Sequence, residues 1–185
     1  MTLPRARLRR RGRANDDGVS VASRAATPGD AEQVADVYLR SRKELVAFAP
    51  LAHSDEDVRR WIPQRLIPAG RTTVAVVDGA IVGFMSVSAA PECSWITHLY
   101  LHPAWIGRGI GTCLLELARR ELPPPIRLFT FQANERARIF YERRGFKAVS
   151  FSDGSGNEEK CPDVLYEWRP ADAASNPSAS PRRPA

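Results

Sequence analysis

Three glycines at alternate positions, Gly107, Gly109 and Gly111, lie between an apolar strand-like run and an amphipathic helix, in the stretch HPAWIGRGIG. Glycine has no Cβ, so a ligand can approach the main-chain N–H groups closely. The first turn of a helix adds unpaired N–H donors and a partial positive charge. This combination is typical of an anion site, most often one for phosphate.

The spacing of the glycines excludes two common phosphate loops. A Rossmann fingerprint requires a third glycine at the position of Thr112, and a P-loop ends in Gly-Lys-Ser/Thr, whereas Gly111 is followed by Thr-Cys. A tight strand–helix turn without a ligand is the simpler alternative for the glycines and stays open at this point.

The elements next to this loop follow from hydrophobic periodicity. The run at residues 93–103 predicts a strand that ends at Pro103 and leads into the glycines. From Gly109 onward, helical spacing predicts a helix with one apolar face: Ile110, Cys113, Leu114, Leu117 and Ala118.

Capping and turn signals predict the elements before this strand. We expect a first strand at residues 19–25 and a capping box of Thr27 with Asp30. The helix that follows has apolar positions at Val34, Val37, Tyr38, Leu45 and Phe48. A second capping box, Ser54 with Asp57, opens a short helix with Val58, Trp61 and Ile62 on its apolar side. The dipeptide Asp78-Gly79 predicts a hairpin between two strands in residues 72–88.

The C-terminal third continues the alternation of strands and helices. We expect a strand at residues 123–131, a helix at 134–145 that ends at Gly145, and strands at 146–151 and 164–168. The predicted order is β-α-α-β-β-β-α-β-α-β-β, an α/β (α+β) domain with a mixed sheet between helices.

Composition indicates one ordinary folded domain. Hydrophobic residues make up 43% and charged residues 26% of the 185-residue chain. Neither a stretch of the roughly 20 apolar residues that cross a bilayer nor a secretory signal is visible. The three cysteines lack close pairing and indicate reduced thiols, so we expect a cytoplasmic protein.

The net charge of +6 comes largely from six arginines within residues 1–18. Residues 1–18 and 171–185 have the composition of disordered tails, and the domain is expected at 19–170. Because this body is nearly neutral, we expect neither nucleic acid nor a membrane as its partner.

Residues 106–111 (IGRGIG) resemble the acetyl-CoA signature of the GNAT N-acetyltransferase superfamily, Q/R-x-x-G-x-G/A. The glycines match, whereas Ile106 replaces the leading Gln or Arg. A second motif, N-x-x-A-x-x-F-Y-x-x-x-G-F, is matched by Asn134, Ala137, Phe140, Tyr141, Gly145 and Phe146. The resemblance covers about residues 19–169 and is nearest to small bacterial members with a stretch like DGSGNEEKCPD before the last strand.

The resemblance implies a mostly antiparallel sheet of about seven strands with about four helices, and direct transfer of an acetyl group from acetyl-CoA to an amine. It implies main-chain donors to the pyrophosphate from Gly107, Arg108, Gly109, Ile110, Gly111 and Thr112. It also implies that the backbone of Leu99, Tyr100 and Leu101 pairs with the pantetheine arm and polarises the thioester carbonyl. Asn134, Ala137 and Phe140 are expected to contact the coenzyme, although asparagine is also a favoured helix N-cap.

Tyr141 is the expected general acid for the departing thiolate, with Phe140 expected in the core role beside it. The general base stays open among Glu92, His98, Glu158, Glu159 and water. His53 is a candidate for acceptor contact or a surface residue. No metal is expected.

Two other functions remain alternatives. One is a non-catalytic acyl-CoA-binding or sensing protein with this fold. The other is a nucleic-acid-associated acetyltransferase that binds through its arginine tail. A homodimer is also left open, and the sequence does not identify the acceptor amine.

Overall fold

A computed structural model describes residues 20–170, so the two predicted tails and Val19 lie outside the described residues. Seven strands form one sheet with the order β1-β2-β3-β4-β5-β7-β6. The strands are β1 (Ala22–Ala25), β2 (Thr72–Val77), β3 (Ala80–Ala89), β4 (Ser94–Leu101), β5 (Ile126–Phe131), β6 (Lys147–Ser152) and β7 (Asp163–Trp168). The helices are α1 (Ala31–Leu45), α2 (Asp55–Trp61), α3 (Ile110–Glu121) and α4 (Glu135–Glu142). This confirms the predicted fold and order of elements.

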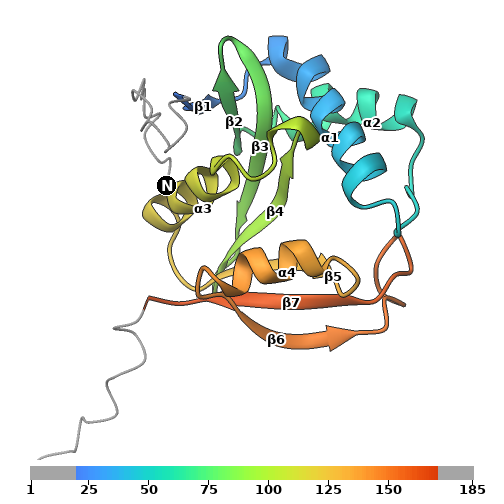
Figure 1. The fold of residues 1–185 in the computed structure, drawn as a ribbon, viewed down its shortest axis with the longest axis vertical. Coiled ribbons are helices and arrows are strands. Elements are labelled where there is room, and N and C mark those ends of the chain that lie inside the picture. The colour runs from blue at the N-terminus through green and yellow to red at the C-terminus, as the bar shows by residue number, and fades with distance from the viewer. Residues whose placement is uncertain (1–19, 171–185) are drawn as a thin grey trace, which may run out of the picture.

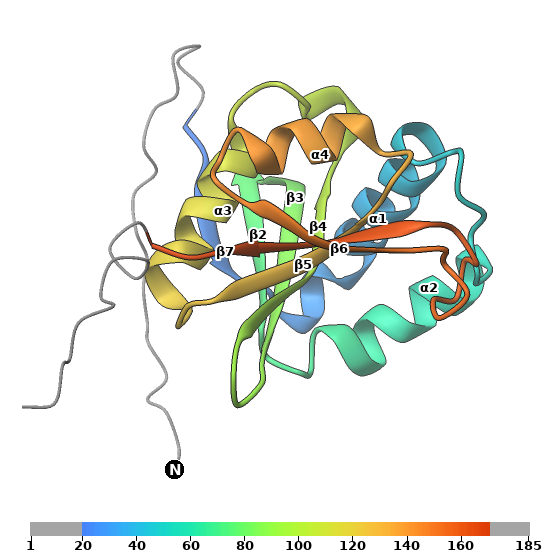
Figure 2. The same cartoon turned by 90° about the horizontal axis from the view of Figure 1, so that it is seen from below.

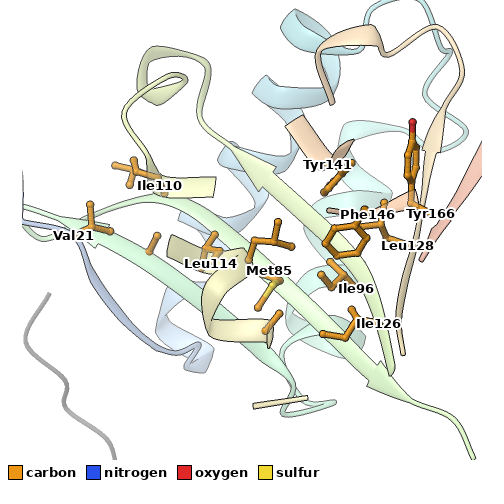
Figure 3. Packing of buried hydrophobic residues seen from close by; sticks show 14 of the residues in the cluster. Val21, Met85, Ile96, Ile110, Leu114, Ile126, Leu128, Tyr141, Phe146 and Tyr166 are labelled. Carbon is orange, nitrogen blue, oxygen red and sulfur yellow. The ribbon is translucent and has the colours of Figure 1, made fainter. Parts of the chain in front are cut away.

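Side chains alternate between the two faces of the sheet, and each face is covered by different helices (Figures 1 and 2). Val74 and Phe84 pack against α1 and the segment after α2. Their neighbours Ala75 and Met85 pack against α3 and the end of α4. Figure 3 shows this second cluster, in which Leu114 and Met85 lie near Ile96. The helices therefore form a layer on each face.

The pair β4–β5 is the parallel pair of this otherwise antiparallel sheet. Its register contains two steps, Ser94 with Ile126 and Trp95 with Arg127, after which the two strands diverge. β4 remains paired with β3, and β5 with β7, along their lengths. The side of β4 that faces β5 therefore has no strand partner beyond Trp95. Figure 1 shows the divergence between β4 and the β5–β7–β6 part of the sheet.

A register shift between Ser86 and Val87 leaves Thr97 without a cross-strand partner on β3. The shift is a β-bulge, a feature that re-aims side chains and often lies next to functional sites. After it, Leu99 and Leu101 pack on the α3 face, whereas Tyr100 packs on the α1 face.

Turn and cap chemistry agrees with the predicted positions. Asp78 and Gly79 both have positive φ, 48° and 81°, as a tight hairpin requires. Asp30 accepts hydrogen bonds from the Thr27 backbone and hydroxyl, which forms the capping box before α1. Gly145 has φ 77° in the turn that follows α4, so the chain reverses at the predicted glycine, although the helix itself ends at Glu142, earlier than predicted.

Two details of the helices differ from the sequence prediction. α1 ends at Leu45, so Phe48 lies beyond the helix. The Phe48 ring packs edge-on against the Phe131 ring, with 6.1 Å between the ring centres. An apolar residue that makes this tertiary contact therefore matched the helical spacing without belonging to the helix. In α3, Leu115 is fully buried, while Cys113 and Leu117 are only partly buried. Gly111 is also buried, and a Cβ there would lie 3.3 Å from the Phe140 ring.

Candidate active site

A cavity of about 590 Å³ extends through the gap between β4 and β5. Its walls come from the C-terminal half of α1, the end of β4, the glycine loop, β5 and α4. It brings together twelve predicted coenzyme-site and catalytic residues: Leu99, Tyr100, Leu101, Gly107, Gly109, Ile110, Gly111, Thr112, Asn134, Ala137, Phe140 and Tyr141. Side chains from both faces of the sheet line it, because Leu99 and Leu101 pack on the α3 face and Tyr100 packs on the α1 face.

Arg108 is the predicted coenzyme residue that does not line the cavity. Its guanidinium lies 4.7 Å from the centre of the Trp105 ring, outside the glycine loop. The Arg108 backbone is still part of the glycine loop, so only its side chain lies away from the cavity.

The three glycines serve the turn as well as the cavity. Gly107 and Gly109 have φ of 83° and 77°, which disfavours residues with a Cβ. Gly109 is the N-cap of α3 and offers no side-chain acceptor, so the first N–H groups of α3 have no side-chain cap. A Cβ on Gly111 would lie 3.3 Å from the Phe140 ring. A tight turn and an anion site are therefore compatible here.

Asn134 has the capping role that the sequence offered as an alternative. Its Oδ1 accepts a hydrogen bond of 3.1 Å from the Ala137 N–H, at the start of α4. Within residues 20–170 its side-chain nitrogen makes no hydrogen bond, and the residue lines the cavity. The amide can therefore cap α4 and still donate to a ligand.

The structure corrects the expectation that Phe140, and not Tyr141, is the core residue of this pair. Tyr141 is the core residue, 7% exposed, and Phe140 is only partly buried beside it. The Tyr141 ring packs 5.7 Å from Phe146 and 6.1 Å from Tyr166 (Figure 3). Ala137, Phe140 and Tyr141 all lie on the inner face of α4. The sequence alone does not show which of two adjacent apolar residues on this face is more deeply buried, and Phe140 was therefore wrongly expected in the core position.

The Tyr141 hydroxyl is nevertheless available to a ligand. It has no hydrogen-bond partner among residues 20–170, and the residue lines the cavity. Burial raises the pKa of Tyr141 above its usual value, so the hydroxyl stays protonated at neutral pH. It is therefore a donor whose proton has no competing protein acceptor.

Among the candidate bases, His98 is the one that lines the cavity. Burial lowers the pKa of His98 to about 4, so its imidazole is neutral near pH 7. Glu92 is exposed in the turn before β4, Glu158 pairs with the exposed His53 at 3.1 Å, and Glu159 pairs with Arg42 at 3.1 Å. Within the described part of the chain, no aspartate or glutamate lines the cavity.

Sequence reasoning missed four arginines that line the cavity: Arg42, Arg136, Arg143 and Arg144. Basic residues in the last turn of a helix are common because they complement the helix dipole, so the pair after Glu142 gave no specific signal. Arg42 is 3% exposed and lies between Glu159 and the Phe131 ring, contacts that involve segments distant in sequence.

The model of the acetyltransferase (GNAT) family matches residues 38–146 of this chain. No curated protein matches it. Similar solved structures include the PaiA N-acetyltransferase of Thermoplasma acidophilum in complex with coenzyme A, 23% identical over 80% of this chain and 98% of that one, with a TM-score of 0.63. An acetyltransferase of Thermus thermophilus is 21% identical over 80% and 96% of the chains, with a TM-score of 0.65. A GNAT-family acetyltransferase of Bacillus cereus is 18% identical over 80% and 96%, with a TM-score of 0.64.

Between residues 20 and 170, each helix is too short or too polar to span a bilayer. The same part of the chain contains no group of three or more His, Cys, Asp or Glu side chains placed to hold a metal ion.

Proposed function

Because this chain belongs to the acetyltransferase (GNAT) family, we propose that it transfers the acetyl group of acetyl-CoA directly to an amine of a small molecule or a protein. The observation that carries this proposal is the cavity, which unites the glycine loop, the free side of β4 and the hydroxyl of Tyr141. The coenzyme A complex of the similar PaiA enzyme supports the choice of co-substrate.

In the proposed complex, the pyrophosphate lies on the glycine loop and the first turn of α3. The pantetheine arm runs along β4, where the backbone of Leu99, Tyr100 and Leu101 has no strand partner on the β5 side. An extended ligand can add to such an edge through main-chain hydrogen bonds. The thioester then lies in the gap, within reach of the α1 side of the sheet.

The chemistry needs an attacking nitrogen, a stabilised oxyanion and a proton for sulfur. The neutral amine nitrogen forms a C–N bond at the thioester carbonyl, and a β4 N–H stabilises the negative charge on oxygen. Collapse of this intermediate breaks the C–S bond, and the electron pair leaves with sulfur. Tyr141 gives its proton to the sulfur, and the proton lost by the nitrogen returns to Tyr141 through water.

The proton transfer from Tyr141 fits the environment of the leaving group. A free thiol has a pKa near 8.5 and a free phenol near 10, so transfer to a fully formed thiolate in water is uphill. Burial disfavours the charged form of both groups, so the thiolate in this cavity is also a stronger base than in water. The effect on the thiolate therefore offsets the raised pKa of Tyr141, and proton donation has to accompany C–S cleavage so that no free thiolate forms.

The acceptor has to lose the proton of its ammonium form before it attacks, and we expect water to take this proton. With no carboxylate on the cavity wall of the described chain and a His98 pKa of about 4, no lining group is a strong base for an ammonium. We therefore expect the acceptor to bind and react as the free amine. Its rate should rise with pH until the amine is unprotonated.

A thiol-release assay with acetyl-CoA and a panel of amines and peptide N-termini tests the proposal. Amine-dependent release of CoA, with a product heavier by one acetyl group, is the expected result. Tight coenzyme binding without release for any acceptor would instead favour the non-catalytic acyl-CoA-binding alternative.

A further inference from the structure

The coenzyme loop of this chain lacks a side chain that can bind phosphate at its first position. Ile106 occupies the place of the Gln or Arg in the acetyl-CoA signature, and it lines the cavity. An apolar side chain can neither donate a hydrogen bond nor offset the charge of a pyrophosphate. The backbone donors of the loop remain, but they are neutral.

Arg144 lies at the same loop from another part of the fold. Its Nη2 donates to the hydroxyl of Thr112, which belongs to the first turn of α3. Its Nη1 donates to the Phe140 carbonyl at 3.0 Å, and the guanidinium lies 4.0 Å above the Phe140 ring. These contacts fix the cation beside the unpaired N–H groups at the start of α3.

Arg144 makes no ion pair among residues 20–170, although its surroundings are partly buried. Its Nε is inaccessible and has no hydrogen-bond partner. The nearby Arg119 is different, because it pairs with Glu116 at 2.8 Å. Burial, together with the repulsion from Arg119, lowers the pKa of Arg144 from its usual value. Glu116 offsets part of this effect, and an anion beside the guanidinium would stabilise its charged form further.

The charge on the cavity wall favours an anion at this end. Arg136, Arg143 and Arg144 line it from α4 and the turn after it, and none of the three has an ion pair within the described chain. Arg136 and Arg143 are exposed, so solvent weakens their fields, whereas Arg144 is held by three contacts. Arg144 is therefore the cation most able to form a fixed contact.

We propose that Arg144 binds the pyrophosphate of the coenzyme and supplies the cationic contact that Ile106 cannot. The inference rests on the proposed function, because it assumes that acetyl-CoA occupies the cavity. A guanidinium forms strong charge-assisted hydrogen bonds to phosphate oxygens. Arg144 would also connect α4 to α3 across the ligand, since it already contacts the Thr112 hydroxyl.

The test compares three ligands: acetyl-CoA, acetyl-dephospho-CoA, which lacks the 3′-phosphate, and S-acetyl-pantetheine, which lacks the pyrophosphate together with the phosphoadenosine. Calorimetry gives the dissociation constants of the wild type and of Arg144→Gln. We expect Arg144→Gln to weaken acetyl-CoA and acetyl-dephospho-CoA equally, by about 10- to 100-fold, the size of a charged hydrogen bond. Binding of S-acetyl-pantetheine should not change.

Three variants complete the design. Arg120→Gln removes an exposed arginine of α3 that is outside the cavity, and it should bind all three ligands as the wild type does. Ile106→Arg, added to Arg144→Gln, should restore most of the lost affinity by returning the residue type of the signature. If Arg144→Gln has a lowered melting temperature, Arg144→Met keeps the packing on Phe140 and removes the charge.

Several outcomes would overturn the inference. Unchanged acetyl-CoA affinity in Arg144→Gln and Arg144→Met shows that the cation makes no contact. An equal loss for S-acetyl-pantetheine shows a structural effect, and a loss confined to acetyl-CoA moves the contact to the 3′-phosphate. Failure of Ile106→Arg to restore binding removes the compensation argument. A wild type that binds none of the ligands contradicts the proposed function instead.

Discussion

Replacing Tyr141 with phenylalanine tests the proposed chemistry with little structural disturbance. The ring packs against Phe140, Phe146 and Tyr166, with centroids 5.1 to 6.1 Å away, and phenylalanine keeps these contacts. The hydroxyl has no hydrogen-bond partner among residues 20–170, so its loss leaves no protein group unsatisfied. We therefore expect a melting temperature within a few degrees of the wild type and unchanged acetyl-CoA affinity.

The rate should respond very differently from the stability. Removing a general acid typically lowers kcat by about 10²- to 10⁴-fold, which corresponds to roughly 3–5 kcal/mol on the barrier. Thiol release, measured at saturating acetyl-CoA and acceptor, gives kcat; calorimetry gives coenzyme binding on the same preparation. The effect should be largest with acetyl-CoA and smaller with a thioester whose thiol is more acidic, because that leaving group needs less protonation.

Tyr166→Phe is the matched control for this change. Tyr166 is fully buried in the same cluster, but its hydroxyl donates to Glu142 and does not line the cavity. It should lose stability, by about 1.5–3 kcal/mol for a hydrogen bond to a charged carboxylate, and retain kcat. Equal kcat for wild type and Tyr141→Phe, under conditions in which the chemical step limits turnover, would refute the assignment of Tyr141.

Three other changes have outcomes fixed by charge or geometry. Burial lowers the pKa of His98 from 6.5 to about 4, so as the pH falls the imidazole is protonated in the unfolded chain before it is protonated in the folded protein. The free energy of unfolding should therefore drop by about 2 kcal/mol between pH 7 and pH 5. Denaturant titrations at the two pH values should show a smaller drop for His98→Gln. Hydrogen bonds from Arg24, and then from Thr27, hold the pKa of Asp30 well below its usual value, so Asp30→Asn should cost about 1–3 kcal/mol at pH 7. That deficit should shrink below pH 4, where the wild type loses the same contribution, and a deficit independent of pH would contradict the ion-pair explanation. Gly154→Ala should destabilise by at least about 2 kcal/mol in thermal unfolding, since its Cβ would lie 2.2 Å from the Cys161 backbone; wild-type stability would contradict that geometry.

The sequence predicted the parts of the site that are contiguous along the chain. The glycine loop and the face of α4 each lie within one short segment, so both motifs could be recognised, and the resemblance to the GNAT superfamily assigned Gly109 and Tyr141 to a common ligand. The capping boxes and the Asp78-Gly79 hairpin were predictable for the same reason, because their chemistry is local.

Contacts between distant segments were not predictable from one sequence. Arg144 meets Thr112 only because α4 packs beside α3, and Arg42 meets Glu159 only because the turn before β7 lies near α1. The rank of Tyr141 over Phe140 in burial depends on the exact rotation of α4, which neighbouring apolar residues do not specify. The absence of carboxylates from the cavity wall of residues 20–170 also emerged only in three dimensions.

Several unpaired donors of the described chain lie at one cavity, and this supports a ligand there. Native structures pair more than about 90% of their buried polar groups, so exceptions call for an explanation. Here the Tyr141 hydroxyl, the Asn134 amide nitrogen, the Arg144 cation and the free side of β4 all lie at one cavity. Of these groups, Arg144 Nε is buried without a partner, whereas the Tyr141 hydroxyl and the Asn134 amide nitrogen are open to the cavity. A ligand with a phosphate for Arg144 and the glycine loop, amides for the free side of β4 and a thioester for Tyr141 would use these donors together, which is why acetyl-CoA fits better than a plain anion.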